Sequence, residues 1–243
     1  KEKVNIVEIY DKYISSLNDK NTDDRYKGKE HWFHASSAGT CVRKQYYRHV
    51  EKVSEPPFSK DTMRLFRLGN LVHDDIQEAV LLHSKDTNTE VYIEKEIQID
   101  SWNVRGFLDL LVVSDNELYD IKTCNHKKFK SISGDLNRFN EPINYYLQLA
   151  TYGYWYEQKS GKELSKMSLL YYNKDTSEMH EIQVDKNYIN QAQSYWFNVK
   201  QQVNYEPEIK LGVAPRAKWE CNYCNYFEHC GEGYTDGKRK NFK

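Results

Sequence analysis

Two adjacent segments, each with an acidic residue inside mostly apolar sequence, limit what this chain can fold into. Residues 104–113 are a nearly continuous apolar run around Asp109, and residues 117–123 carry Asp120 and Lys122. A Ser-Asp-Asn turn signal separates them, which predicts a pair of antiparallel strands. Because residues two apart in a strand share a face, Asp120 and Lys122 point the same way, and pairing brings Asp109 beside them.

This carboxylate–lysine group suits the hydrolysis of a phosphodiester. Carboxylates bind Mg²⁺ or Mn²⁺, which neutralises a scissile phosphate and activates or orients a water. The ammonium of Lys122 can hold that water and offset developing charge. The alternative is an ordinary surface strand with a salt bridge, since short Asp-x-Lys sequences are common. The apolar surroundings favour a functional site, because burying a carboxylate without a purpose is costly.

The rest of the chain predicts a single α/β domain of 243 residues, 1–243. Residues 1–60 are expected to be a helical region, 61–204 the core, and 205–243 an irregular Cys-rich tail. Apolar spacing of three and four predicts helices at 4–17, 43–49, 62–83, 142–158 and 186–204. Strands are expected at 91–99, 104–113, 117–123, 166–173 and 179–184, the first three as an antiparallel meander. The polar stretches 19–31 and 127–141 are predicted to be loops, and Glu94 and Glu96 are assigned to the solvent face.

Composition narrows the kind of partner. The net charge is −1, so any binding of DNA must come from local patches, for which Arg43 and Lys44 are candidates. No window approaches the roughly 18 uninterrupted apolar residues of a membrane span. We therefore expect a cytoplasmic protein without a membrane partner.

Three further residues lie where they could serve the carboxylate site. His73 is on the long helix before the sheet, and a neutral imidazole is a good metal ligand. Gln148 and Tyr152 are four apart on the helix after the sheet, so they share a face. Taken singly, a lone helix histidine and a helix tyrosine are more often packing residues.

In order and spacing, these residues resemble the motif set of the RecB-like branch of the PD-(D/E)xK nucleases. The matching elements are Gly69-x₃-His73, Gly106-x₂-Asp109, Asp120-x-Lys122 and Gln148-x₃-Tyr152. The resemblance implies a restriction-endonuclease-like core, a mixed central sheet flanked by helices. It also implies that His73, Asp109, Asp120 and the Ile121 carbonyl ligate Mg²⁺ or Mn²⁺ and that Lys122 is catalytic. Gln148 and Tyr152 would be supporting active-site residues. Asp120 stands where many members carry Glu, which is an accepted variant.

Four of the five cysteines are organised as a ligand set. Cys221, Cys224 and Cys230 fall within ten residues, and Cys41 lies far upstream. Four thiolates suit either Zn²⁺ or an iron–sulfur cluster, and spacing alone does not separate the two. The arrangement resembles that of iron–sulfur RecB-like nucleases, namely the CRISPR-associated exonucleases of the adaptation module and the nuclease domain of AddB-type helicase–nucleases. That resemblance implies a [4Fe–4S] cluster that joins the tail to the helical region, with Zn²⁺ as the alternative.

The sequence hypothesis is therefore a divalent-metal-dependent DNA exonuclease. The resemblance implies action on single-stranded DNA ends with 5′–3′ polarity. The alternative is a catalytically weak or inactive DNA-binding or assembly module of a recombination or CRISPR adaptation complex. Proteins of recombination, CRISPR or phage-replication systems are the expected partners.

Overall fold

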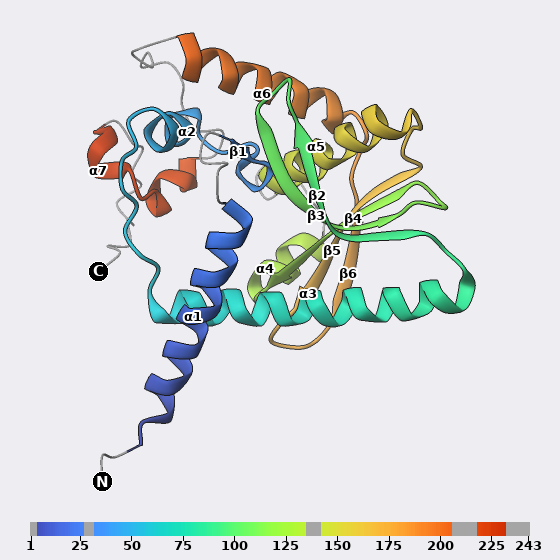
Figure 1. Cartoon of the computed structure of the whole chain (residues 1–243), viewed down its shortest axis with the longest axis horizontal. Coiled ribbons are helices and arrows are strands. Elements are labelled where there is room, and N and C mark those ends of the chain that lie inside the picture. Colours follow the sequence, from blue (N-terminus) through green and yellow to red (C-terminus); the bar gives the residue numbers. More distant parts are fainter. Residues whose placement is uncertain (1–3, 27–31, 135–141, 206–217, 232–243) are drawn as a thin grey trace.

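The computed structural model describes residues 4–26, 32–134, 142–205 and 218–231 (Figure 1). Its helices are α1 (Ile6–Tyr26), α2 (Val42–His49), α3 (Lys60–Thr87), α4 (His126–Ser133), α5 (Ile143–Ser160), α6 (Tyr188–Tyr205) and α7 (Phe227–Cys230), with 3₁₀ turns η1 (Ala35–Ser37) and η2 (Lys218–Tyr223). Its strands are β1 (Phe33–His34), β2 (Val91–Ile99), β3 (Val104–Val112), β4 (Glu117–Cys124), β5 (Lys166–Asn173) and β6 (Met179–Gln183).

The strands form one mixed sheet centred on β3. Strand β2 runs antiparallel along one edge of β3. The other edge of β3 has two partners, because β1 pairs in parallel with residues 104–105 and β4 pairs antiparallel with residues 110–112. Beyond β4 the order continues to β5, in parallel, and then to β6. Residues 106–109 of β3 therefore lie between two partners that share one edge, and this opening defines the site discussed below.

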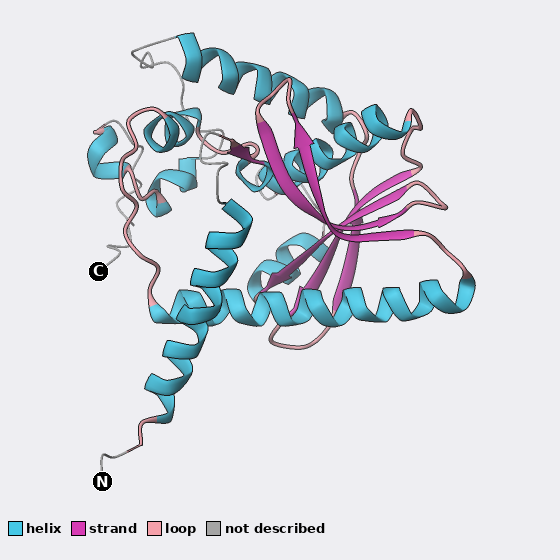
Figure 2. Ribbon diagram, in the orientation of Figure 1, coloured by secondary structure: helices cyan, strands magenta, loops and turns pink. Residues whose placement is uncertain are grey.

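Helices cover both sides of the sheet. Figure 2 shows α5 and α6 on one side of the strands and the long α3 on the other. The α5–α6 contact includes a buried hydrogen-bond chain, in which Trp196 Nε1 donates to Thr151 Oγ1 at 2.8 Å and Thr151 Oγ1 donates to the Leu147 carbonyl at 2.7 Å. Trp196 and Thr151 are both fully buried. This pair of hydrogen bonds gives the buried indole N–H an acceptor, as buried tryptophans usually require.

The α/β fold class predicted from the sequence is confirmed. The antiparallel meander of the first three predicted strands is also correct, and strand 166–173 matches β5 residue for residue. The long helix extends beyond the predicted 62–83 because Ser59 caps its start and Asn88, at φ 53°, ends it in the left-handed conformation. None of the described helices has a stretch long and apolar enough to traverse a lipid bilayer.

Two predicted loops are wrong in part. Helix α1 continues to Tyr26, well past the predicted end at residue 17. Residues 126–133 form α4, because the Asn125 side chain accepts the Lys128 N–H at 2.8 Å and Phe129 and Ile132 are buried. Three lysines around two apolar residues hid this short amphipathic pattern. Of the expected tail, 205–243, the structure describes Tyr205, which ends α6, and residues 218–231, which form η2 and α7.

We expect Thr151→Val to destabilise the protein without touching the carboxylate site. The substitution keeps the volume but leaves the buried Trp196 N–H without its acceptor, which costs about 1–3 kcal/mol. Urea unfolding followed by tryptophan fluorescence measures the change in the free energy of unfolding. Ser194→Ala is the control, because that exposed hydroxyl donates to the Asn190 carbonyl within α6 and its loss should change stability by less than about 0.5 kcal/mol. Equal effects of the two substitutions would contradict this account.

Candidate active site

Strands β3 and β4 place two carboxylates opposite each other at the point where the strands separate. The last β3–β4 pairs join Leu110 to Tyr119, and one further step in this register sets Asp109 against Asp120. Asp109 is 8% exposed and Asp120 is 0% exposed. In place of a ladder hydrogen bond, Asp109 Oδ2 accepts the Ile121 N–H at 2.7 Å. The opening in the sheet is thus held by a side chain that bridges the two strands.

Lys122 supplies the positive charge that the two carboxylates need. Its Nζ lies 2.5 Å from Asp120 Oδ2, 3.4 Å from Gln148 Oε1 and 5.0 Å from the centre of the Tyr145 ring. Burial alone would lower the pKa of Lys122, but the charges of Asp120 and Asp109 outweigh it and the pKa is raised. Lys122 is therefore an ammonium in this structure.

The carboxylates nevertheless repel each other. Burial and the neighbouring charge of Asp120 raise the pKa of Asp109 well above its ordinary value, against the opposing effects of Lys122 and the Ile121 N–H. Asp120 is fully buried, and the Lys122 ammonium lies 2.5 Å from its Oδ2. One ammonium thus compensates two buried carboxylates incompletely, and the site favours a further cation.

Helix α3 brings a neutral imidazole to the carboxylates. His73 Nδ1 lies 3.7 Å from Asp109 Oδ2, and the Ile121 backbone is a hydrogen-bonding neighbour of the ring. Burial and the charge of Lys122 lower the pKa of His73, so the ring is neutral at pH 7 and can ligate a metal. One helical turn further on, Gln77 Nε2 donates to the Asp109 carbonyl at 2.9 Å, which fixes the helix against β3.

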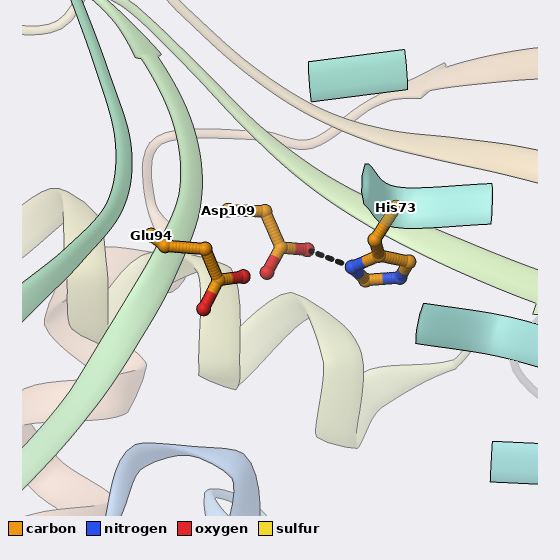
Figure 3. A group of neighbouring side chains, drawn as sticks. All are labelled: His73, Glu94 and Asp109. Atoms are coloured by element: carbon orange, nitrogen blue, oxygen red, sulfur yellow. Dashed lines mark ion pairs between the residues drawn. The ribbon is translucent and has the colours of Figure 1, made fainter. Parts of the chain in front are cut away.

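Glu94 belongs to this group, although the sequence analysis assigned it to the solvent face. Ligand atoms of His73, Glu94 and Asp109 all lie within 4.8 Å of one another, and Figure 3 shows the three side chains turned toward one another. The β2–β3 register sets Glu94 against Asp109. Glu94 has a φ of 47°, a left-handed value that is strained for a non-glycine strand residue. Strand alternation does not reveal this left-handed residue. The pairing register of β2 with β3 does show that Glu94 lies opposite Asp109.

Helix α5 orients Asp120 from the other side. Gln148 Nε2 donates to Asp120 Oδ1 at 3.1 Å and to the Tyr152 hydroxyl at 3.2 Å. Gln148 and Tyr152 do share a face, as their spacing predicted, and both are buried. A Cβ on Gly106 would lie 2.8 Å from Ala35 Cβ and 3.1 Å from Tyr152 Cε1, so the close approach of η1 and α5 to β3 requires glycine there.

These residues border one cleft of about 250 Å³. Its walls come from β1, η1, α3, β2, β3, β4 and α5, and the lining side chains include His34, Ser36, Asn70, His73, Glu94, Arg105, Phe107, Asp109, Lys122, Gln148 and Tyr152. Metal-ligating and cationic groups thus face a space large enough for part of a nucleotide chain.

The segments that carry the four cysteines of the predicted cluster lie together in a separate region, where Cys41 and α2 contact η2 and α7. The Cys41 N–H donates to the Glu220 carboxylate at 2.9 Å, and Arg43 Nη1 donates to Cys230 Sγ at 3.4 Å. The five cysteines all lie within the described residues and form no disulfide. Packing has therefore brought together residues nearly 190 positions apart in the sequence.

The two residues proposed to bind DNA lie beside these cysteines rather than in the cleft lining. Arg43 is 7% exposed and contacts Cys230, while Lys44 Nζ pairs with Glu220 at 3.3 Å. Contact of Arg43 and Lys44 with DNA stays a prediction.

Comparison with known proteins identifies the family. The PD-(D/E)XK nuclease superfamily matches residues 77–231, and the chain belongs to this superfamily. A search of the curated proteins gave no significant match.

Solved structures share the fold at low identity. The crystal structure of SSO0001 is 19% identical, with a TM-score of 0.53 over 91% of this chain and 97% of that one. A putative exonuclease from Eubacterium rectale is 14% identical, with a TM-score of 0.52 over 86% and 92%. The alkaline exonuclease LHK-Exo from Laribacter hongkongensis is 16% identical, with a TM-score of 0.50 over 76% and 94%. The sequence-based assignment to the PD-(D/E)xK nucleases is thus confirmed at the level of the superfamily.

We expect Asp109→Asn to stabilise the metal-free protein. Because the pKa of Asp109 is higher in the folded than in the unfolded protein, Asp109 lowers the free energy of unfolding at every pH above its unfolded-state pKa. Asparagine does not titrate, so it removes this loss, and its side-chain oxygen can still accept the Ile121 N–H. The gain at pH 7 should be about 1–2 kcal/mol, in the range of stabilising changes at functional sites. It should shrink as the pH falls toward 4. Chemical denaturation in EDTA across this pH range measures it, and a loss of stability at pH 7 would contradict the electrostatic account.

Proposed function

We propose that this chain is a divalent-metal-dependent DNA exonuclease of the RecB-like branch. The observation that carries the proposal is the convergence of Asp109, Lys122 and His73 on one cleft, with His73 3.7 Å from Asp109 and the fully buried Asp120 2.5 Å from Lys122. Neighbours described as exonucleases share the fold. In this proposal Asp109, Asp120, His73 and the Ile121 carbonyl bind Mg²⁺ or Mn²⁺, and Glu94 is a further candidate ligand.

The residues present fit such a cation. They offer hard oxygen donors and one neutral imidazole, and ligand atoms of His73, Glu94 and Asp109 lie within 4.8 Å of one another. When bound, the cation would neutralise charge on the scissile phosphate and make the attacking water more acidic. The family thus explains why two carboxylates are buried together at a cost to stability.

The chain's own residues supply the remaining chemistry. Lys122 contacts Asp120 and lines the cleft, so it would hold the attacking water and offset charge on the phosphate in the transition state. Gln148 would keep both Asp120 and Lys122 in place, since it contacts each. Tyr152 would position Gln148 as a neutral phenol, because burial and then the charges of Asp120 and Asp109 raise the pKa of Tyr152 well above its ordinary value.

Cleavage of end-labelled DNA tests the proposal. We expect single-stranded DNA to be degraded with Mn²⁺ or Mg²⁺ and not in EDTA, with a 5′ label released first as a mononucleotide. Lys122→Ala should lower the rate by at least about 10²-fold, the usual loss when a transition-state contact is removed. Lys159→Ala, on the exposed end of α5, is the control and should cleave at the wild-type rate.

Three results would contradict parts of this proposal. Cleavage that persists in Lys122→Ala would remove Lys122 from catalysis. Early release of a 3′ label would reverse the polarity. Metal-dependent DNA binding without cleavage by the wild type would favour the assembly-module alternative.

We also propose that Cys41, Cys221, Cys224 and Cys230 hold a [4Fe–4S] cluster. The hydrogen bonds from the Cys41 N–H to Glu220 and from Arg43 to Cys230, which bring the two cysteine-bearing segments of the chain together, support this. The resemblance of the cysteine spacing to that of iron–sulfur RecB-like nucleases favours this cluster over Zn²⁺, which four thiolates suit equally well.

Metal analysis of anaerobically purified protein distinguishes the two centres. We expect about four iron atoms per chain with broad visible absorption, lost in Cys221→Ser. Cys124→Ser is the matched control, because Cys124 is a buried thiol at the end of β4 and does not belong to the four-cysteine group. One zinc per chain with no visible absorption would overturn the iron–sulfur proposal.

A further inference from the structure

The cleft has a second charged end. Arg105, 2% exposed, lines it together with His34 and Ser36. The short parallel pairing of β1 with β3 sets His34 directly beside Arg105. Arg105 therefore lies at the β1 end of the opening in β3, and Asp109 lies at the β4 end.

This second end carries positive charge. Burial, and then the charges of Arg105, Arg48 and His49, lower the pKa of His34 to about 4, so its ring is neutral at pH 7. The guanidinium of Arg105 remains charged at any relevant pH. A permanent cation and a neutral imidazole that can donate a hydrogen bond thus face the same space as the carboxylates.

The two ends are too far apart to hold one phosphate. Arg105 precedes Asp109 by four residues in β3, so they share a face and lie about 13 Å apart along the strand. At a rise of 3.4 Å per stacked nucleotide, and more in an extended strand, that distance spans roughly two to four nucleotides. The charges match a chain of phosphates that enters at one end and reacts at the other.

Resting on the proposed nuclease function, we propose that Arg105, with His34 and Ser36, binds a non-scissile phosphodiester of the nucleic-acid strand. The scissile phosphate of the same strand lies beside Lys122. A planar guanidinium binds phosphate through two parallel hydrogen bonds, which makes this subsite selective for position as well as charge. The subsite sets the register of the strand in the cleft, and dinucleotides too short to reach it lose its contribution.

Oligonucleotides with one neutral methylphosphonate linkage test this subsite. A series that moves the linkage along single-stranded DNA is titrated into wild type, Arg105→Gln and Arg67→Gln, with Ca²⁺ replacing Mg²⁺ so that binding is measured without turnover. Arg67 is the matched control, since it lies on α3 and does not line the cleft.

We expect one linkage, roughly two to four nucleotides from the scissile position, to weaken wild-type binding by about 10–100-fold when neutralised. Arg105→Gln should bind unmodified DNA more weakly by a similar factor and be insensitive to that linkage. Arg67→Gln should reproduce the wild-type pattern. An undiminished penalty in Arg105→Gln would overturn the assignment to Arg105.

Two further arms keep the outcome decisive. If Arg105→Gln does not fold, Arg105→Lys replaces it, because lysine keeps the charge and should show a smaller loss of binding at the same linkage. If no single neutral linkage weakens binding to the wild type, the subsite is overturned. Cleavage of the same oligonucleotides in Mn²⁺ separates the two proposals. If binding depends on the position of the neutral linkage but no DNA is cleaved, only the nuclease function is overturned. If DNA is cleaved but the affinity is the same for every linkage position, only the subsite is overturned.

Discussion

The structure depends on one electrostatic constraint, a pair of carboxylates buried face to face between β3 and β4. Asp109 and Asp120 repel each other, and Lys122 alone compensates them incompletely. The fold accommodates the pair by letting the strands separate, and the Asp109 side chain takes the Ile121 N–H in place of a backbone carbonyl. A chain selected for stability alone would fill this position with apolar residues.

The surrounding elements are arranged to hold this pair rigidly. Helix α3 fixes the Asp109 backbone through Gln77, and α5 fixes the Asp120 carboxylate through Gln148. Both contacts come from neutral amides, which fix Asp109 and Asp120 in place without neutralising their carboxylates. Such orientation by rigid helices is what a metal site needs, because the ligands are then set before the cation arrives. The opening that the carboxylates require in the sheet also provides the cleft in which a strand of DNA could lie.

Much of this could be predicted from the sequence, because strand alternation and ordered motifs are local signals. They placed Asp120 and Lys122 on one face and put Gln148 and Tyr152 on one side of α5. The contribution of Glu94 could not be predicted in this way, since it depends on a left-handed residue inside a strand. The positions of Arg105 and His34 in the cleft depend on the two-residue strand β1, which is too short to leave a periodic pattern. Helix α4 was missed because its lysines masked two buried apolar residues.

Anomalous diffraction from crystals grown with Mn²⁺ tests the central claim most directly, namely that Asp109 and Asp120 are buried together to bind a catalytic cation. The account predicts one strong peak in the cleft, about 2.0–2.3 Å from an oxygen of each carboxylate, with His73 as a further ligand and Lys122 moved away from Asp120. A cleft without Mn²⁺ at saturating concentration, with Lys122 still paired to Asp120, would contradict it.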